Sequence, residues 1–122
     1  MNRILLLLSI FSFSFLLVGC ISDPVVDSVK NSSLESCPQK TVGQMADDFM
    51  SSPSWESLVA EDKSTYVNVE GGITYSEKQV NALIQFLVSE NLDKFEFNAL
   101  EFNGVPQNAF MANVLLNNMC SE

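Results

Sequence analysis

The residues of this chain that could carry chemistry are three cysteines, Cys20, Cys37 and Cys120, and a scattering of acids. A thiol can pair as a disulfide, bind a metal ion or act as a nucleophile, depending on its surroundings. The 122 residues include no histidine, which removes the commonest general base and the commonest zinc ligand. The sequence also lacks a G-x-S-x-G elbow, a P-loop and an EF-hand loop. We therefore predict no catalytic residue, no metal site and no cofactor.

Acid pairs are the remaining candidates for catalysis, and their spacing is unfavourable. Asp47 and Asp48 are neighbours on a predicted helix, where adjacent residues do not face each other. Glu96 and Glu101 differ by five positions, which puts them on opposite faces of an ideal strand unless a bulge intervenes. The charged stretch 61–63 is typical of a turn. No pair fits a glycosidase motif, so the prediction is a protein that is not an enzyme.

The first twenty residues indicate export. Arg3 is the only early positive charge, residues 4–18 are apolar apart from three serines, and Gly19 follows. A basic start, a short apolar run and a small residue before the cleavage point are typical of a secretory signal peptide. The alternative is an uncleaved membrane helix, but an apolar run of about fifteen residues is short, since a spanning helix needs roughly twenty.

The tetrapeptide Leu17-Val18-Gly19-Cys20 resembles a lipobox, the motif cut by bacterial lipoprotein signal peptidases of the signal peptidase II type. The resemblance covers residues 1–20 and implies a bacterial lipoprotein: a diacylglycerol on Cys20, cleavage before it and acylation of the new amine. Three acyl chains anchor firmly, because each buried methylene contributes about 0.8 kcal/mol. In enterobacterial sorting an Asp after the cysteine retains a lipoprotein in the inner membrane. Ile21 therefore favours the outer membrane within the cell envelope.

With Cys20 assigned to lipid, Cys37 and Cys120 are left as a pair in an oxidising compartment. Free thiols or a redox pair are the alternative, but the wide spacing without a C-x-x-C disfavours them. We predict a structural Cys37–Cys120 disulfide. In the chain-entropy model a bridge closing such a long loop contributes roughly 4.5 kcal/mol, which matters for a domain of this small size.

The mature chain is strongly acidic. Without residues 1–19 it has five lysines against fifteen acids, a net charge of −10. Such a charge argues against nucleic acid or an anionic lipid surface as a direct partner, and it permits a basic protein partner. The simpler interpretation is a solvated acidic surface that keeps the domain soluble.

Three segments follow from composition. Residues 1–19 form the signal peptide, residues 20–36 a lipidated N-terminus and flexible tether, and residues 37–122 a single globular α+β domain. The tether prediction depends on the Ser- and Asp-rich stretch 21–36, which contains Pro24 and no sustained apolar period.

Within the domain the apolar period changes twice. Thr41 and Gln44 fit a capping box ahead of a helix, and Pro106 fits the first turn of a second helix with an apolar face at 109, 112, 115, 116 and 119. Between them, period-two patterns predict strands at 55–60, 65–75, 80–88 and 95–102. The predicted fold class is α+β: a helix, a four-stranded antiparallel meander and a helix, with both helices packed on one face of the sheet.

Two irregularities stand out in the predicted strands. The Gly71-Gly72 pair indicates a bulge, a sharp bend or a close approach of another backbone, with a tight hairpin as the alternative. The apolar phase slips between Ala99 and Leu100, which indicates a bulge or partial cover on both faces.

Function is predicted only at the level of class. The leading hypothesis is a non-catalytic protein-interaction module, held on the membrane by Cys20, that docks an envelope protein. Trp55, Tyr66 and Tyr75 are a possible recognition surface, with half-buried core positions as the alternative. Two other hypotheses are an inhibitor, immunity or exclusion protein against a lysozyme, bacteriocin or phage, and a carrier of a small apolar ligand. The pattern from Tyr66-Val67-Asn68-Val69 through Val105-Pro106-Gln107-Asn108 resembles that of small bacterial lipoproteins with a helix-flanked sheet, a resemblance that implies no activity.

Overall fold

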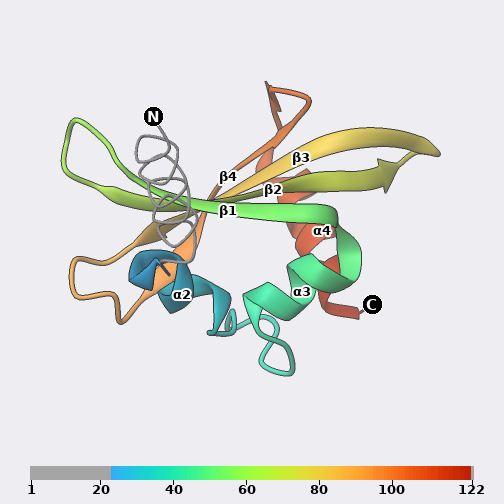
Figure 1. Ribbon diagram of the computed structural model, residues 1–122. Helices are drawn as coiled ribbons and strands as arrows, with labels where there is room; N and C mark the ends of the chain where they lie inside the picture. The colour runs from blue at the N-terminus through green and yellow to red at the C-terminus, as the bar shows by residue number, and fades with distance from the viewer. Residues whose placement is uncertain (1–22, 122) are drawn as a thin grey trace, which may run out of the picture.

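The computed structural model describes residues 23–121, so the predicted signal peptide, the lipobox and Cys20 lie outside the described residues. In chain order the elements are α2 (Pro24–Lys30), α3 (Val42–Phe49), β1 (Ser51–Val59), β2 (Thr65–Tyr75), β3 (Lys78–Val88), β4 (Phe95–Phe102), β5 (Val105–Pro106) and α4 (Ala109–Ser121). Each strand pairs with the next in antiparallel fashion, in the order β1-β2-β3-β4-β5 (Figure 1). The predicted α+β class and antiparallel meander are confirmed, with one short strand more than predicted.

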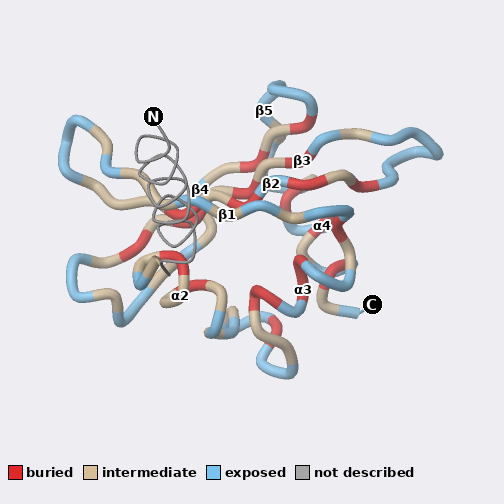
Figure 2. Tube along the Cα trace, viewed as in Figure 1, coloured by how far each residue is buried: buried red, intermediate tan, exposed pale blue. Residues whose placement is uncertain are grey.

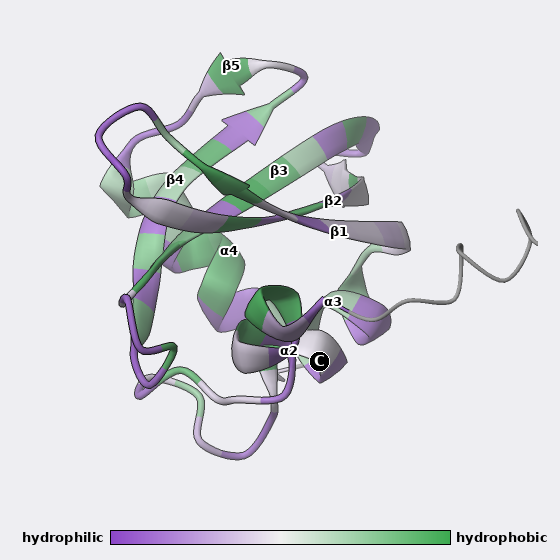
Figure 3. Ribbon diagram, turned by 60° about the vertical axis from the view of Figure 1, so that its left-hand side comes forward, coloured by the Kyte–Doolittle hydropathy of each residue, from purple (hydrophilic) through white to green (hydrophobic). Residues whose placement is uncertain are grey.

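Burial alternates along the central strands, so one face of the sheet belongs to the core. In β2 and β3 alternate residues are buried, and the residues between them are half-buried or exposed (Figure 2). Figure 3 shows that β3 is mainly hydrophobic, with hydrophilic bands along it. The buried sheet residues join residues of all the described helices in one hydrophobic cluster, whose largest fully buried side chains are Phe86, Met45, Ile84, Leu100 and Met119.

Helix α3 forms where the capping box predicted it. The backbone N–H of Gln44 donates to Thr41 Oγ1 at 3.1 Å, and the N–H of Thr41 donates back to Gln44 Oε1 at 2.9 Å. These two bonds satisfy donors that a helix start leaves unpaired. Met45 and Ala46 carry its buried stripe.

The prediction of a flexible tether over residues 20–36 is wrong for residues 24–30, because these residues form helix α2. Asp23 caps it by accepting hydrogen bonds from the N–H groups of Val25 and Val26, at 2.9 and 3.3 Å. Val26 and Val29 are buried in the core, and α2 contacts strands β1, β2 and β3. The helix has only seven residues, so its stability comes from this packing rather than from an apolar period visible in the sequence.

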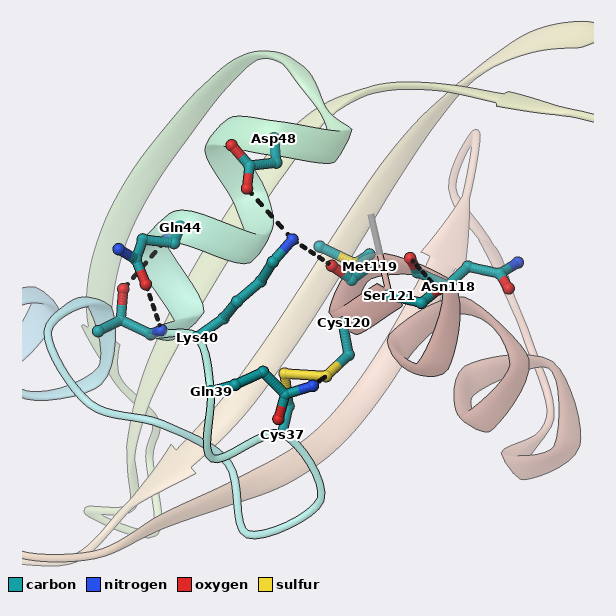
Figure 4. Close-up of a disulfide and its surroundings, with 10 residues drawn as sticks. Cys37, Gln39, Lys40, Gln44, Asp48, Asn118, Met119, Cys120 and Ser121 are labelled. Carbon is teal, nitrogen blue, oxygen red and sulfur yellow. Dashed lines mark hydrogen bonds and ion pairs between the residues drawn. A yellow bond between two sulfur atoms is a disulfide. The ribbon is translucent and has the colours of Figure 1, made fainter.

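The predicted disulfide between Cys37 and Cys120 is present, with an S–S distance of 2.11 Å and a sequence separation of 83 (Figure 4). It joins the loop before α3 to the last turn of α4. Beside it, Lys40 Nζ donates to Asp48 Oδ2 at 3.2 Å and to the Met119 carbonyl at 3.5 Å. A cation near the C-terminal carbonyls of a helix is favourable, so Lys40 reinforces the same junction.

The Gly71-Gly72 pair lies inside β2, so the alternative of a tight hairpin is wrong. A Cβ atom on Gly71 would lie 3.0 Å from both Met50 Cβ and the Ser51 carbonyl oxygen, which confirms the close approach of another backbone. The register between β1 and β2 shifts at Ser51/Ser54, next to this contact. Strand β1 begins at Ser51, whereas the sequence predicted a start at residue 55.

Pro106 was predicted to lie in the first turn of a helix, and this prediction is wrong. Pro106 lies in the edge strand β5, which pairs with the end of β4. Asn103 and Gly104 have φ values of 51° and 82°, and they connect Phe102 to Val105 in a two-residue hairpin. Such turns require positive φ at both central residues, which Asn-Gly supplies. Pro106 suits an edge strand because it has no N–H to donate.

Candidate protein-interaction surface

The face of the sheet opposite the core is defined by the strand register. Directly paired residues share a face and successive residues alternate, so the residues between the buried ones form a second face. We call this set the open face: Ser54, Glu56, Leu58, Tyr66, Asn68, Glu70, Leu83, Gln85, Leu87, Glu96, Ala99 and Glu101. They form three rows across the strands, which begin at Leu58, Glu56 and Ser54 in β1.

The open face combines negative charge with half-buried apolar side chains. Every charged residue in it is a glutamate, and Glu56, Glu70 and Glu96 are exposed. Its apolar members, Leu58, Tyr66, Leu83, Leu87 and Ala99, are only half-buried. An acidic surface with apolar side chains between the carboxylates is complementary to a partner that presents Lys or Arg around an apolar centre.

A hollow of about 110 Å³ lies on this face, with Glu56, Asn68, Glu70 and Leu83 among its lining residues. The Oδ1 atom of Asn68 is shielded from solvent and accepts no hydrogen bond from the described residues. Asn81 donates a hydrogen bond to Glu70, which holds that carboxylate in place. The hollow thus presents the carboxylates of Glu56 and Glu70, both acceptors, and a side chain with several N–H donors would match them.

The three aromatic residues predicted as one recognition surface are not brought together. Trp55 pairs with Val69 on the core face, where it packs against the hydrophobic cluster. The centroid of its ring lies 5.7 Å from Lys30 Nζ. Tyr66 lies on the open face. Tyr75 lies at the end of β2, and the centroid of its ring is 5.2 Å from that of Phe102. The three residues therefore do not form one patch: Trp55 takes the half-buried core position given as the alternative, and Tyr66 belongs to the open face.

The acids considered for catalysis are either exposed to solvent or far from each other. Asp47 and Asp48 are exposed, and Asp48 forms an ion pair with Lys40. Glu96 and Glu101 do share the open face, because the register shift between β3 and β4 inserts one extra residue between them. They lie opposite Leu87 and Leu83, four residues apart on β3, so roughly 13 Å separates them. That exceeds the spacing of a glycosidase pair.

Two acids have lowered pKa values, and both act in local structure. The hydrogen bond from Ser57 lowers the pKa of Asp23 below its ordinary value of 3.8, with further help from the Val26 and Val25 amides, and partial burial opposes the shift. The backbone N–H of Ser64 lowers the pKa of Asp62. Asp62 lies in the β1–β2 turn, as the sequence predicted for the stretch 61–63. A lowered pKa keeps both carboxylates charged at neutral pH and does not prepare them for proton transfer.

A larger groove of about 1110 Å³ lies between the segment 28–36 and the segments 62–65 and 87–97. Its apolar lining residues are Leu34, Leu87, Val88, Phe95 and Phe97, and its other lining residues are mostly serines, acids and lysines. The groove is open and mixed in character. A carrier site for a small apolar ligand would be enclosed and mainly apolar, and this groove is neither.

Within residues 23–121 no group of three or more Cys, Asp or Glu side chains is arranged to hold a metal ion. In the same span, no helix has the length and apolar character needed to cross a membrane. Comparison of the chain with protein-family models, with curated proteins and with solved structures found no match.

Sequence reasoning missed the open face as a unit. Its glutamates fall in the polar phase of three separate strands, β1, β2 and β4, which by itself indicates only solvent exposure. The signal that could have found it was the meander itself, because short turns fix which residues lie opposite each other.

Proposed function

We propose that this protein is a membrane-anchored envelope lipoprotein that acts as a non-catalytic interaction module, and that its open face docks a basic envelope protein. The observation that carries the proposal is the composition of that face: glutamate is its only charged residue type, and half-buried apolar side chains lie between the carboxylates. Binding by such a surface is steered by charge and held by apolar contact.

The arrangement of the helices supports the choice of face. We propose that the helices cover one face of the sheet and leave the other free. In favour are the contacts of α2 with three strands, those of α3 with β1 and α4, and the buried residues Ala112, Leu115 and Met119 of α4. A sheet buries its apolar face against helices, and its second face is then available to solvent or to a partner.

Anchoring through lipid on Cys20 would hold this module close to the membrane. Helix α2 begins at Pro24, so four peptide steps connect it to Cys20, at most about 14 Å of extended chain. The partner would then be met near the bilayer surface, in the outer membrane if Ile21 directs sorting as expected. The sequence of residues 1–20 carries this part of the proposal.

A second candidate function draws on the same face. An inhibitor, immunity or exclusion protein that blocks a basic lysozyme, bacteriocin or phage protein needs an acidic surface of this kind, and the hollow lined by Glu56 and Glu70 would accept a Lys or Arg side chain. The two candidates differ in the origin of the basic partner, which is the cell's own envelope in one case and an attacking agent in the other.

The test is purification of the lipidated full chain from its own envelope after in-cell crosslinking. We expect one basic protein to be captured, and to be lost with Cys20→Ser and with the double change Glu56→Lys and Glu70→Lys. The matched control is Glu61→Lys with Glu77→Lys, which makes the same charge change in two exposed hairpin turns. Capture that survives the open-face change would refute docking there. If no envelope protein is captured, but the purified protein binds lysozyme in a salt-sensitive manner, the inhibitor candidate is favoured.

A further inference from the structure

The segment from Phe102 to Ser121 contains no charged residue, in a chain where 17% of the residues are charged. It forms β5 and α4 and holds three of the five large hydrophobic side chains that are exposed among residues 23–121. Phe110 is 74% exposed and Val114 38% exposed, one helical turn apart on α4. An exposed phenylalanine beside an exposed valine on an uncharged helix is unusual for a surface that meets only water.

The exposed residues of α4 follow the helical repeat. Ala112, Leu115 and Met119 form the buried side of the helix. The exposed side is made of residues three or four positions apart, which therefore lie on neighbouring positions of the helix surface: Phe110, Asn113, Val114, Asn117, Asn118 and Ser121. We call these six residues the α4 stripe. It has an apolar end at Phe110 and Val114 and an amide-rich end at Asn117 and Asn118.

We propose that the α4 stripe pairs two copies of this chain. A two-fold contact places the same surface patch on both subunits, so the patch as a whole must be complementary to itself. A patch whose charges all have one sign is not, and two mature chains of net charge −10 repel each other. A patch of apolar side chains is, and Asn side chains fit such a patch as well, since each amide both donates and accepts hydrogen bonds. The α4 stripe consists only of apolar and uncharged polar side chains, so it is complementary to itself.

The contact is small, which sets the expected strength. A helix of 13 residues is about 20 Å long, and one face of it offers less than the roughly 800 Å² per partner of a standard interface. We expect a weak dimer that forms at high local concentration and dissociates on dilution. Confinement to a membrane by lipid raises local concentration and would favour it. The inference is independent of docking at the open face, because the two surfaces share no residue.

The test is sedimentation velocity of the lipidated full chain in detergent over a range of concentrations. We expect a monomer–dimer equilibrium, and we expect Phe110→Asp to raise the dissociation constant by more than about tenfold. Phe110 is exposed and lies in the first turn of α4, where an acid is favourable to a helix, so the fold should survive. Phe110→Leu should keep the dimer.

The matched control is Val59→Asp, which adds the same charge at a side chain that is 68% exposed at the end of β1. It should leave the dimer intact. Circular dichroism of each variant verifies that the helices are retained. A wild-type protein that stays monomeric at every concentration, or a dimer that Phe110→Asp and Val59→Asp weaken equally, would overturn the proposal. The proposal would also be overturned if the α4 stripe bound a different protein and no second copy of this chain.

Discussion

Ser57 in strand β1 donates a 2.7 Å hydrogen bond from its Oγ to Oδ2 of Asp23, the residue that caps helix α2. The other carboxylate oxygen of Asp23 accepts the amides at the start of that helix. One side chain thus joins the first described helix to the sheet. If the protein is anchored through Cys20, as we propose, this junction is where the anchored end meets the folded domain.

Asp23→Ala should lower the free energy of unfolding by about 1–2 kcal/mol, because it removes the helix cap and the bond to Ser57 together. Urea denaturation of the wild-type and variant proteins measures the difference. Asp23→Asn keeps a cap oxygen and should lose less, and Ser57→Ala should remove only the contact with the sheet. If Asp23→Ala costs no more than Ser57→Ala, the cap contributes nothing to stability.

The same carboxylate predicts a pH dependence. The pKa of Asp23 is lowered in the folded protein, so the folded state favours the charged form. Its contribution is therefore present above the ordinary pKa of 3.8, and it is lost as the pH falls below 3.8 through the folded-state pKa. We expect the stability advantage of the wild-type protein over Asp23→Asn to be constant near neutral pH and to decrease in this acidic window. Urea midpoints of both proteins as a function of pH measure this, and an advantage that grows on acidification would contradict the sign.

The two adjacent glycines of β2 should respond differently to alanine. On Gly71 a Cβ would lie 3.0 Å from Met50 Cβ and from the Ser51 carbonyl oxygen, so Gly71→Ala should cost about 1–3 kcal/mol. On Gly72 the nearest atom, Ser51 Cβ, would be 3.4 Å away, an ordinary contact. Gly72→Ala is therefore the matched control and should be nearly neutral. Thermal unfolding of the two variants checks the ranking, and equal losses would mean that the close approach of β1 is not what Gly71 serves.

Loss of the disulfide should be the largest single destabilisation. The bridge closes a loop between Cys37 and Cys120 that spans most of the domain, and removing such a native bridge typically costs about 2–5 kcal/mol. Cys37→Ala with Cys120→Ala should therefore unfold at much lower urea concentration. Cys20→Ser should leave the midpoint unchanged, because Cys20 lies outside the bridge. A double variant as stable as the wild-type protein would show that packing of α3 against α4 suffices.

The contrast between α2 and the strands shows which parts of the fold could be predicted. The strand pattern depends on many residues in succession, such as the alternation from Val67 to Ile73. Helix α3 was predicted from the capping box of Thr41 and Gln44. Helix α2 offers only Val26 and Val29, and its stability depends on a core that the local sequence does not show. A usable signal was present in the Asp23-Pro24 pair, because Asp favours the cap and Pro the first helical position.

The site was harder to predict than the fold, because it depends on register. Glu96 and Glu101 share a face only because a bulge inserts one residue between them. Trp55 and Tyr66 lie on opposite faces. The reason is the register of β1 with β2, which pairs Trp55 with Val69 and Leu58 with Tyr66. Residue types along one strand do not determine these relationships. They follow from the turns and bulges that align each strand with its neighbour.

Site-specific photo-crosslinking in living cells tests the docking surface most directly. A photoreactive amino acid in place of Gln85, at the centre of the open face, should give a specific adduct with one basic protein. That adduct should disappear when Glu56→Lys and Glu70→Lys are added, and the same probe in place of Glu61, at the β1–β2 turn, should give none. An adduct from position 61 but not from position 85, or one from position 85 that is indifferent to the two charge reversals, would contradict the account.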